Sequence, residues 1–236
     1  MRIIFLNCWQ AKAGKAFFDF VERESKTTEI FCFQEVTPDL YSALLASFVG
    51  HKGSYRKSKV LLLGRIRYGQ AIFVKKRFKM NTSVKIPLYC ELKNDIGFMQ
   101  CASVLVGGKK LWLGNLHGKA HPGHKLDTKI RLNQSKVIID FFKNKKGSKI
   151  IGGDFNLLPR TRSIKMFEEE GYVDLVKKFK VTSTRNRLAW KQLKKNEEKQ
   201  YFADYVFVSP EVKVKNFEVP DCESSDHLPM VLDFEV

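Results

Sequence analysis

The stretch "GGDFNLLP", at residues 152–159, decides how the fold of this chain is read. It follows Lys149–Ile151, which ends in two isoleucines and predicts a buried β-strand. Two glycines then remove side chains from the strand end, and Asp154 and Asn156 follow two positions apart. Glycine lets a ligand or an opposite strand approach the backbone closely. The pattern therefore predicts a strand end that carries polar side chains beside a cleared space.

Apolar runs separated by turn signals continue in both directions from this stretch. The predicted strands cover residues 2–7, 29–35, 59–64, 68–76, 82–92, 97–117 (with a hairpin at "VGGKK"), 201–209, 212–219 and 228–236. The predicted helices lie around residues 17–21 and at 38–48, 128–143 and 164–170, and residues 191–200 form a charged loop or a short exposed helix. In the helix over residues 128–143, we expect the buried face to carry Ile130, Val137, Ile138 and Phe141.

The order of these elements predicts the fold class. Strands and helices alternate at the start, strands dominate the centre, and alternation then returns. Two packed sheets flanked by helices accommodate this many strands, so we predict a mixed α/β fold. No change in composition divides the 236 residues. We therefore expect a single domain over residues 1–236, and a monomer.

The charge of the chain favours a polyanionic partner. Lysine and arginine number 42 against 25 acidic residues, which gives a formal net charge of +17. The basic residues occur in several clusters along the chain, so we expect a basic folded surface. Such a surface suits nucleic acid or an anionic membrane surface, although solubility alone is the ordinary alternative.

The cysteines and the start of the sequence favour an intracellular, soluble protein. The five cysteines form no C-x-x-C motif, and Cys8 and Cys32 lie within apolar runs. This usage favours buried, reduced thiols over disulfides or zinc ligands. The opening "MRIIFLN" becomes polar too soon for a signal peptide, and no apolar stretch is long enough to span a bilayer.

Polar side chains end or interrupt the apolar strands at six places, where burial costs free energy unless the groups are paired. The residues are Asn7, Glu35, His117, Asp154 with Asn156, Asp204, and Asp226 with His227. Each one alone has an ordinary structural interpretation, such as a turn cap, a surface ion pair or a hydrogen-bonded core histidine. Their order and spacing together are far more specific. If the strand ends meet at one edge of a sandwich, these residues form a single pocket.

A pocket of this composition suits phosphoryl chemistry. Carboxylates and amides without thiolates favour Mg²⁺ or Mn²⁺ over zinc. A hard cation with His and Asn donors stabilises the negative charge that develops on non-bridging phosphate oxygens. Asp204 beside His227 would raise the basicity of the imidazole and fix its tautomer. We interpret the cleared strand end as exposing Asp154 and Asn156 to a phosphate and its attacking water.

The same motifs resemble those of the endonuclease/exonuclease/phosphatase superfamily and occur in the family's order. They are "FLN" (5–7), "FQE" (33–35), "NLH" (115–117), "GGDFN" (152–156), "ADYVFVS" (203–209) and "SDHLPMV" (225–231). "GGDFN" followed by "SDHLP" is the most specific part, and the resemblance covers essentially the whole chain. It implies a four-layer α/β/β/α sandwich of two mixed sheets with helices outside. It also implies hydrolysis of a phosphate ester with a divalent metal.

The resemblance implies a role for each matching position. Glu35 would be the main metal ligand, helped by Asn7 and Asp226. Asp154 would orient or deprotonate the attacking water, and Asn156 would hold the scissile phosphate.

The remaining positions carry the histidines and their partner. His227, paired with Asp204, would contact a non-bridging oxygen or serve as general base. His117 would stabilise the transition state or protonate the leaving oxygen. The number of metals, one or two, is left open by the resemblance.

Departures from the family pattern indicate which branch of the superfamily the chain resembles. The apurinic-site endonucleases usually carry an acid where this chain has Trp9, and a tyrosine where it has His117. His117 is instead similar to the deoxyribonuclease, deadenylase and sphingomyelinase branches. The stretch "NLHGKAHPGHKLDTKIRLNQ" (115–134) is similar to deadenylases, but Gly118 stands where an apolar residue is usual and their long insertions are missing.

Candidate substrate-binding residues lie near these motifs. Trp9 would stack on a base beside the scissile phosphate, or else pack in the core. Lys119 follows His117, and the nearby His121, His124 and Lys125 are further candidates for the entrance. Arg185 and Arg187, in "STRNR", would contact phosphates, or else form a solvated loop. Trp190, among these arginines, is a second candidate for stacking with the same alternative.

Three hypotheses follow from the sequence. The first is a Mg²⁺-dependent nuclease acting on DNA or RNA, because phosphate backbones reward many Lys and Arg residues. The second is a phosphatase or a phospholipase-type phosphodiesterase acting on inositol phosphates or sphingomyelin. The third is a binding protein that retains the fold but has lost the catalytic activity. The presence of all six polar positions argues against this third hypothesis.

Overall fold

The structure is a computed structural model that describes residues 1–58, 68–81, 83–91, 95–191, 193 and 198–236. One sheet has the strand order β12-β13-β1-β2-β4-β3. Its strands are β1 (Arg2–Asn7), β2 (Ile30–Val36), β3 (His51–Lys57), β4 (Gly69–Lys75), β12 (Lys213–Glu218) and β13 (Met230–Glu235). The strand predicted over residues 59–64 lies outside the described residues.

The second sheet has the order β10-β11-β9-β8-β7-β5, and β6 pairs with β7 beside this path. Its strands are β5 (Lys79–Met80), β6 (Val84–Glu91), β7 (Asp95–Val106), β8 (Lys109–His117), β9 (Ser148–Asp154), β10 (Val173–Asp174) and β11 (Asp204–Val208). Both sheets are mixed, because β1 pairs in parallel with β2, and β8 with β9, while the other pairings are antiparallel.

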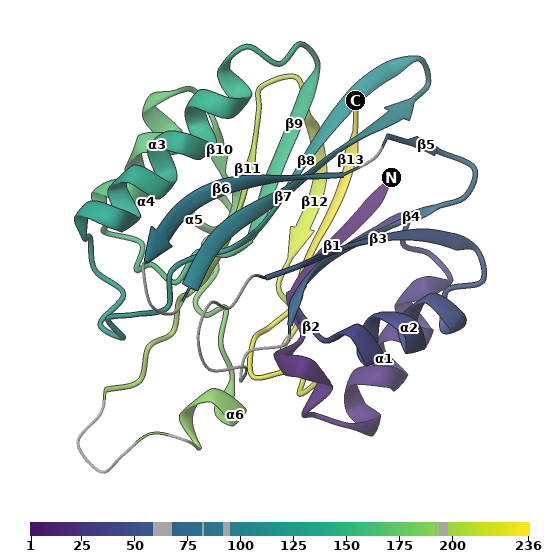
Figure 1. Cartoon of the computed structure of the whole chain (residues 1–236), viewed down its shortest axis with the longest axis horizontal. Coiled ribbons are helices and arrows are strands. Elements are labelled where there is room, and N and C mark those ends of the chain that lie inside the picture. The colour runs from purple at the N-terminus through teal and green to yellow at the C-terminus, as the bar shows by residue number, and fades with distance from the viewer. Residues whose placement is uncertain (59–67, 82, 92–94, 192, 194–197) are drawn as a thin grey trace.

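Helices cover the outer faces of the two sheets. The helices are α1 (Lys15–Ser25), α2 (Pro38–Ser47), α3 (Lys129–Lys143), α4 (Arg162–Glu169), α5 (Leu175–Lys178) and α6 (Arg187–Trp190), with a short 3₁₀ turn, η1, at Trp9–Ala11. Figure 1 shows α1 and α2 on one side of the sandwich and α3, α4 and α5 on the other. The predicted four-layer α/β/β/α sandwich of two mixed sheets is thereby confirmed.

Aromatic side chains fill the layer between the first sheet and its helices. Phe31 stacks on Phe48 with ring centroids 4.8 Å apart, and Phe17 and Phe73 pack around Phe33 at 6.0 and 6.1 Å. On the other side, Phe167 and Phe207 stack at 4.3 Å, which attaches α4 to the second sheet. These apolar contacts hold the sheets at fixed positions, so that polar groups at the strand ends can meet accurately.

The glycine pair of the opening stretch faces protein. A Cβ atom at Gly152 would lie 2.9 Å from ring atoms of Phe5 in β1 of the opposite sheet. Gly153 has a φ of +127°, and its Cβ would lie 2.2 Å from the carbonyl oxygen of Leu116 and 3.0 Å from Gln34 Nε2. The two sheets therefore come into direct contact here. Of the two partners that glycine permits, a phosphate or an opposite strand, protein fills the space at both positions: Phe5 of the opposite sheet beside Gly152, and Leu116 and Gln34 beside Gly153.

The buried face of α3 differs from the expected one. Ile138 is buried as predicted, but Ile130, Val137 and Phe141 are half-buried. The inward positions are instead Arg131, Gln134, Ser135, Ile138, Ile139 and Phe142.

The polar side chains turn inward because the segment between β8 and α3 needs hydrogen-bond donors. Arg131, which is fully buried, donates to the carbonyl oxygens of Lys119, Ala120, Pro122 and Leu126 at 2.7–3.2 Å. The apolar pattern of α3 could not reveal this requirement, because it depends on the neighbouring loop.

The close packing around Gly153, against the neighbouring strand β8 and against Gln34 of the opposite sheet, predicts that stability depends strongly on this glycine. Gly153→Ala adds a methyl group against Leu116 in a backbone conformation that L-residues rarely adopt. We expect the free energy of unfolding, measured by urea denaturation, to fall by about 3 kcal/mol or more. The matched control is Gly107→Ala, where φ is also positive (+53°) but no atom lies within 4 Å, and where only about 1–2 kcal/mol of backbone cost is expected. Equal losses in the two variants would contradict the packing argument.

Candidate active site at the strand ends

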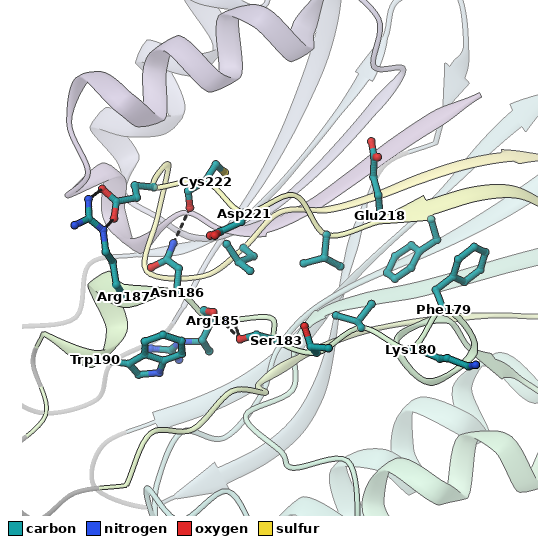
Figure 2. A pocket seen from close by; sticks show the side chains of 16 residues that line it. Phe179, Lys180, Ser183, Arg185, Asn186, Arg187, Trp190, Glu218, Asp221 and Cys222 are labelled. Atoms are coloured by element: carbon teal, nitrogen blue, oxygen red, sulfur yellow. Dashed lines mark hydrogen bonds and ion pairs between the residues drawn. The ribbon is translucent and has the colours of Figure 1, made fainter.

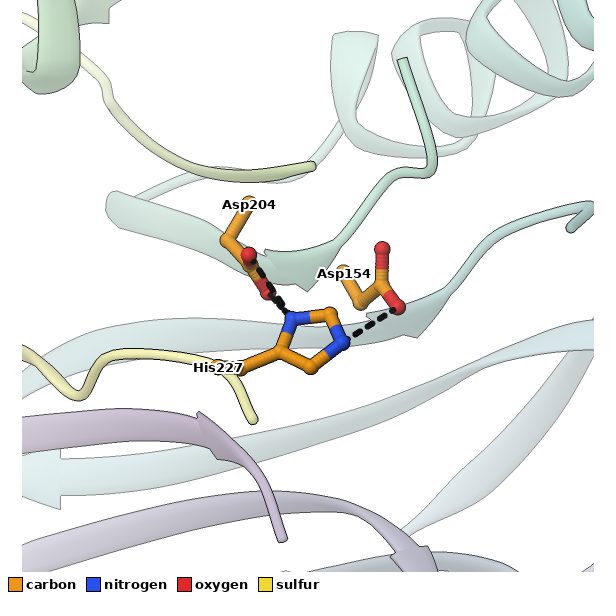
Figure 3. A group of neighbouring side chains, drawn as sticks. All are labelled: Asp154, Asp204 and His227. Carbon is orange, nitrogen blue, oxygen red and sulfur yellow. Dashed lines mark hydrogen bonds and ion pairs between the residues drawn. The ribbon is translucent and has the colours of Figure 1, made fainter. Parts of the chain in front are cut away.

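The carboxyl end of β9 and the amino end of the antiparallel strand β11 form the centre of the site. Asp154 and Asp204 lie directly opposite each other in the register of these two strands. The imidazole of His227 lies between their carboxylates, as Figure 3 shows. Its Nδ1 is 2.9 Å from both oxygens of Asp204, and its Nε2 is 3.7 Å from Oδ2 of Asp154. One ring therefore separates two acids that would otherwise repel each other.

A second group joins this centre from the opposite sheet and from β8. The Nδ2 atom of Asn7 donates to Asp154 Oδ2 at 3.1 Å and to Glu35 Oε1 at 3.2 Å. His117 is the register neighbour of Asp154, and its Nε2 lies 3.7 Å from these same two oxygens. The parallel pairs β1–β2 and β8–β9 thus bring their polar ends to one rim. Two carboxylates, one amide and one imidazole meet there.

Two residues of the site have an unusual backbone. Glu35 has a φ of +55° at an irregularity in the pairing of β2 with β4, and Asn156 has a φ of +54°. Left-handed backbone at residues other than glycine is uncommon and clusters at functional sites. The irregularity in β2 places the Glu35 side chain within reach of Asn7, while the backbone N–H of Asn156 donates to Asp154 Oδ1 at 2.9 Å.

The last polar group, Asp226, is paired with a cation. Arg185 Nη2 donates to Asp226 Oδ2 at 3.0 Å, and Asp226 Oδ1 lies 3.9 Å from His227 Nε2. The backbone of Arg185 also forms an isolated β-bridge with His227. Lys125 is a further buried basic residue: burial lowers its pKa, and the charges of Asp154, Asp204 and Asp226 partly offset this effect.

These charges change the proton affinities of the central groups. Burial raises the pKa of Asp154, but the charges of His227, His117 and Lys125 outweigh it and lower that pKa to about 2. Burial and Arg185 lower the pKa of His227, but the carboxylates of Asp204 and Asp154 outweigh them, so that the pKa is raised overall. Asp154 is therefore an ionised acceptor at neutral pH.

The other residues predicted from the sequence have varied positions. Trp9 is half-buried beside the site, and its backbone N–H donates to Asn7 Oδ1 at 3.0 Å. Lys119 is buried, with its ammonium 5.4 Å from the centre of the Tyr89 ring. The Asn156 amide donates to the carbonyl oxygen of Gly118 at 3.3 Å. Arg187 forms an ion pair with Glu223 at the surface and makes no contact with the central acids among the described residues.

Several neighbours of the site were not identified from the sequence. Gln10 donates to Glu35 Oε2 at 3.1 Å, and Ser225 donates to the backbone oxygen of Asn7 at 2.6 Å. The ring of Tyr68 lies 5.6 Å from that of His117. Ser225 stands within the "SDHLP" motif, which was a usable signal. Gln10 and Tyr68 lie in segments with no motif, so only the fold brings them to the site.

The donor set fits a divalent cation. His227, Asp154 and Asp204 offer ligand atoms that lie within 4.8 Å of one another, but Asp204 and His227 already satisfy each other. Glu35 is the better candidate ligand, because its carboxylate accepts from the amides of Asn7 and Gln10 and lies 3.7 Å from His117 Nε2. Oxygen ligands of this kind suit hard cations.

Two mixed sheets that gather acids, imidazoles and amides at one rim define a class of phosphoester hydrolases. The chain belongs to the endonuclease/exonuclease/phosphatase family, whose sequence model matches residues 6–227. Members of this family hydrolyse phosphoester bonds and typically depend on a divalent metal. No curated protein sequence matches the chain.

Solved structures with the same fold have different described activities. A mannosyl-6-phosphatase from Bacteroides thetaiotaomicron is 17% identical, with full coverage of both chains and a TM-score of 0.75. The human Nocturnin catalytic domain with bound sulfate is 19% identical over the whole of this chain and 93% of that one, with a TM-score of 0.74. D. rerio TDP2 with a single-strand DNA product is 17% identical over 100% and 99%, with a TM-score of 0.77. At these identities the likeness shows the shared fold.

The Asp204–His227 contact predicts a measurable change in proton affinity. Asp204→Asn removes the negative charge and weakens the hydrogen bond that hold the proton on His227, so the pKa of His227 should fall. The histidine NMR signals followed against pH would show this, with a His227→Gln sample to assign the signal. His51, which bonds to the carbonyl oxygen of Thr28, is the internal control. An unchanged pKa for His227 would show that Asp204 does not influence the ring.

Proposed function

We propose that this protein is a divalent-cation-dependent phosphodiesterase that hydrolyses DNA or RNA. The observation that carries the proposal is the meeting of Glu35, Asn7, Asp154, His117 and His227 within hydrogen-bonding or near-contact distance at one rim. The net charge of +17 favours a polyanionic substrate over a small phosphate ester. None of the helices in the described part of the chain has the length and hydrophobicity needed to cross a bilayer.

The proposed metal ligands are Glu35 and Asn7, with Asp226 as a third. Asp226 would use Oδ1, since Oδ2 accepts the bond from Arg185. A bound Mg²⁺ or Mn²⁺ supplies charge stabilisation for the phosphate oxygens. The Asn7 amide orientation is set by the Trp9 N–H, which donates to Oδ1, and a cation at this position would compete for that same oxygen.

The proposed catalytic roles follow from the charges. Asp154, ionised at neutral pH, accepts a hydrogen bond from the attacking water, orients it, and takes its proton as the oxygen bonds to phosphorus. His227 is held by Asp204 with Nε2 directed at the site, where it donates to a non-bridging phosphate oxygen. Asn156 donates to the same phosphate after release from Gly118.

His117 is the proposed proton donor to the leaving oxygen. Its Nε2 faces the acids, and the Tyr68 ring packs on the imidazole at 5.6 Å. Protonation of the leaving oxygen completes the cleavage of the P–O bond after water has attacked phosphorus. Trp9, which bonds to Asn7, and Lys119, two residues after His117, are proposed to contact the substrate.

A substrate panel tests the function. Labelled single- and double-stranded DNA and RNA, mannose 6-phosphate, inositol phosphates and sphingomyelin would each be incubated with Mg²⁺ or Mn²⁺, and with EDTA. We expect cleavage of nucleic acid that requires metal and weakens steeply with salt. Release of phosphate or phosphocholine from the other substrates, with nucleic acid intact, would favour the phosphatase or phospholipase alternative. Binding without product under any metal would favour a protein that has lost the chemistry.

Asp154 provides the most direct mutational test. We expect Asp154→Ala to reduce hydrolysis by roughly 10²–10⁴-fold, because no other ionised acceptor occupies its position. Circular dichroism and urea denaturation should show that the fold is retained. Asp140→Ala, which removes an exposed acid paired with Lys136 on α3, is the matched control and should retain activity. Loss of the folded state in Asp154→Ala would indicate a structural role.

Glu35 tests the metal assignment. Glu35→Gln keeps the shape of the side chain but removes its charge, so the Mg²⁺ concentration for half-maximal activity should rise roughly 10–100-fold. Mn²⁺ binding, followed by electron paramagnetic resonance without substrate, should weaken in parallel. Glu170→Gln removes an exposed acid near Lys143 and is the control. An unchanged metal titration would remove Glu35 from the set of ligands.

A further inference from the structure

A hollow adjoins the acid cluster on the side of Arg185. Lys125, Arg185, Trp190, Glu198 and Gln200 are among its lining residues, and its volume is about 360 Å³, within the ~300–1,000 Å³ typical of ligand pockets. It borders the candidate active site directly, because Arg185 lines it and also bonds to Asp226 at 3.0 Å. We call it the Trp190 hollow.

Two cationic donors of the Trp190 hollow lack hydrogen-bond partners. Among the described residues, Lys125 Nζ and Arg185 Nε are buried and have no partner. Lys125 as a whole is only 7% exposed. Buried donors without partners are rare and costly, and each calls for an explanation. Two such donors in one hollow are suited to an anionic group such as a phosphate.

The backbone also holds Lys125 toward the site. Its φ is +56°, an uncommon conformation for lysine, and its carbonyl oxygen accepts from the N–H of Leu158 at 2.9 Å. Leu158 belongs to "GGDFNLLP", so the lysine is tied to the strand end that carries Asp154. Strained backbone of this kind persists only where its surroundings impose it.

An aromatic ring forms the other wall. The rings of Trp190 and Tyr201 pack in an edge-to-face arrangement with centroids 5.1 Å apart, and the indole N–H donates to the carbonyl oxygen of Gln200 at 3.4 Å. Lys199 places its ammonium 5.1 Å from the ring centre, over one face. The ring is thus held in place, and a fixed indole offers a surface on which a base can stack.

A larger groove on the other side of Trp190 is less suited to phosphate. Figure 2 shows Trp190 and Arg185 at one end of it and Phe179 and Lys180 at the other. Its volume is about 820 Å³, but Glu218, Asp221 and Glu223 all line it, and Glu223 neutralises Arg187. These acids repel a phosphate backbone, whereas Glu198 is the acidic lining residue of the Trp190 hollow.

We propose that the Trp190 hollow binds one nucleotide of a single-stranded nucleic acid, next to the phosphate that is cleaved. The base stacks on Trp190, and a phosphate oxygen accepts bonds from Lys125 and Arg185. In a duplex the bases are stacked on one another, so a separate pocket for one base selects single strands or unpaired ends. This inference rests on the proposed nuclease function and adds the class of substrate to it.

A ratio of two activities tests the hollow. We would compare kcat/KM for a labelled oligothymidylate with kcat/KM for bis(p-nitrophenyl) phosphate, a small diester without a base. Trp190→Ala should lower this ratio roughly tenfold, the effect of losing one stacked base, and Trp190→Phe should restore most of it. Lys125→Met should lower the ratio as well, through KM. A general folding defect lowers both activities together, so an unchanged ratio in both variants overturns the proposal.

A binding measurement separates the hollow from the hydrolysis. With Trp9→Phe and Trp112→Phe, Trp190 is the remaining tryptophan, and its fluorescence can be titrated in EDTA. Oligothymidylate should quench it saturably, an abasic strand of equal length should not, and Lys125→Met should weaken the quenching. Absence of quenching overturns the hollow as a base site. Quenching without hydrolysis of any nucleic acid instead overturns the proposed function and retains the binding site.

Discussion

The ring of Phe5 packs against the backbone of Gly152, and the amide of Gln34 lies against Gly153. At these two positions there is no room for a side chain, so the two sheets come into direct contact where β9 ends. The amide of Asn7, at the end of a strand in one sheet, can reach the carboxylate of Asp154 in the other only because of this contact. Gln34 Nε2 also donates to Asn115 Oδ1 at 2.5 Å. This hydrogen bond joins β2 of one sheet to β8 of the other, close to the same strand ends. The geometry of the site therefore depends on packing that contains no catalytic group.

The charges at the rim impose a second condition. Asp154, Asp204 and Asp226 are buried together, and unpaired buried charge is very costly. The structure places a cation or imidazole against each acid: His227 between Asp154 and Asp204, and Arg185 on Asp226. Asp154 can thus remain ionised within the fold, as its low pKa indicates, whereas burial raises the pKa of Asp204. Within the described part of the chain, Glu35 is linked at the rim to the amides of Asn7 and Gln10 and to His117, and a cation can approach it there.

The sequence predicted the parts of this arrangement that follow from strand ends. A polar residue after an apolar run must find partners, and parallel strands end at a common edge, so the sequence alone groups Asn7, Glu35, His117 and Asp154. The inward position of Arg131 on α3 could not, because it answers the needs of carbonyl groups in a loop rather than an apolar pattern. The pairing of Arg185 with Asp226 was missed for a similar reason. It joins segments about forty residues apart, and no local periodicity relates them.

The residues that determine which substrate is bound must lie outside the strand ends. Structures described as a sugar phosphatase, as Nocturnin and as a DNA-bound TDP2 share this fold over the whole chain at 17–19% identity. A common scaffold that accepts such different molecules leaves discrimination to the segments around its rim. In this protein those segments are the loop after His117, which brings in Lys125, and the region near α6, which brings in Trp190. Arg131 supports the first from beneath, and Gln200 and Tyr201 hold the indole of the second. Because such contacts hold the segment around Lys125 and the ring of Trp190, a basic group and an aromatic ring line one hollow near the rim, and a nucleotide is the kind of ligand that uses both.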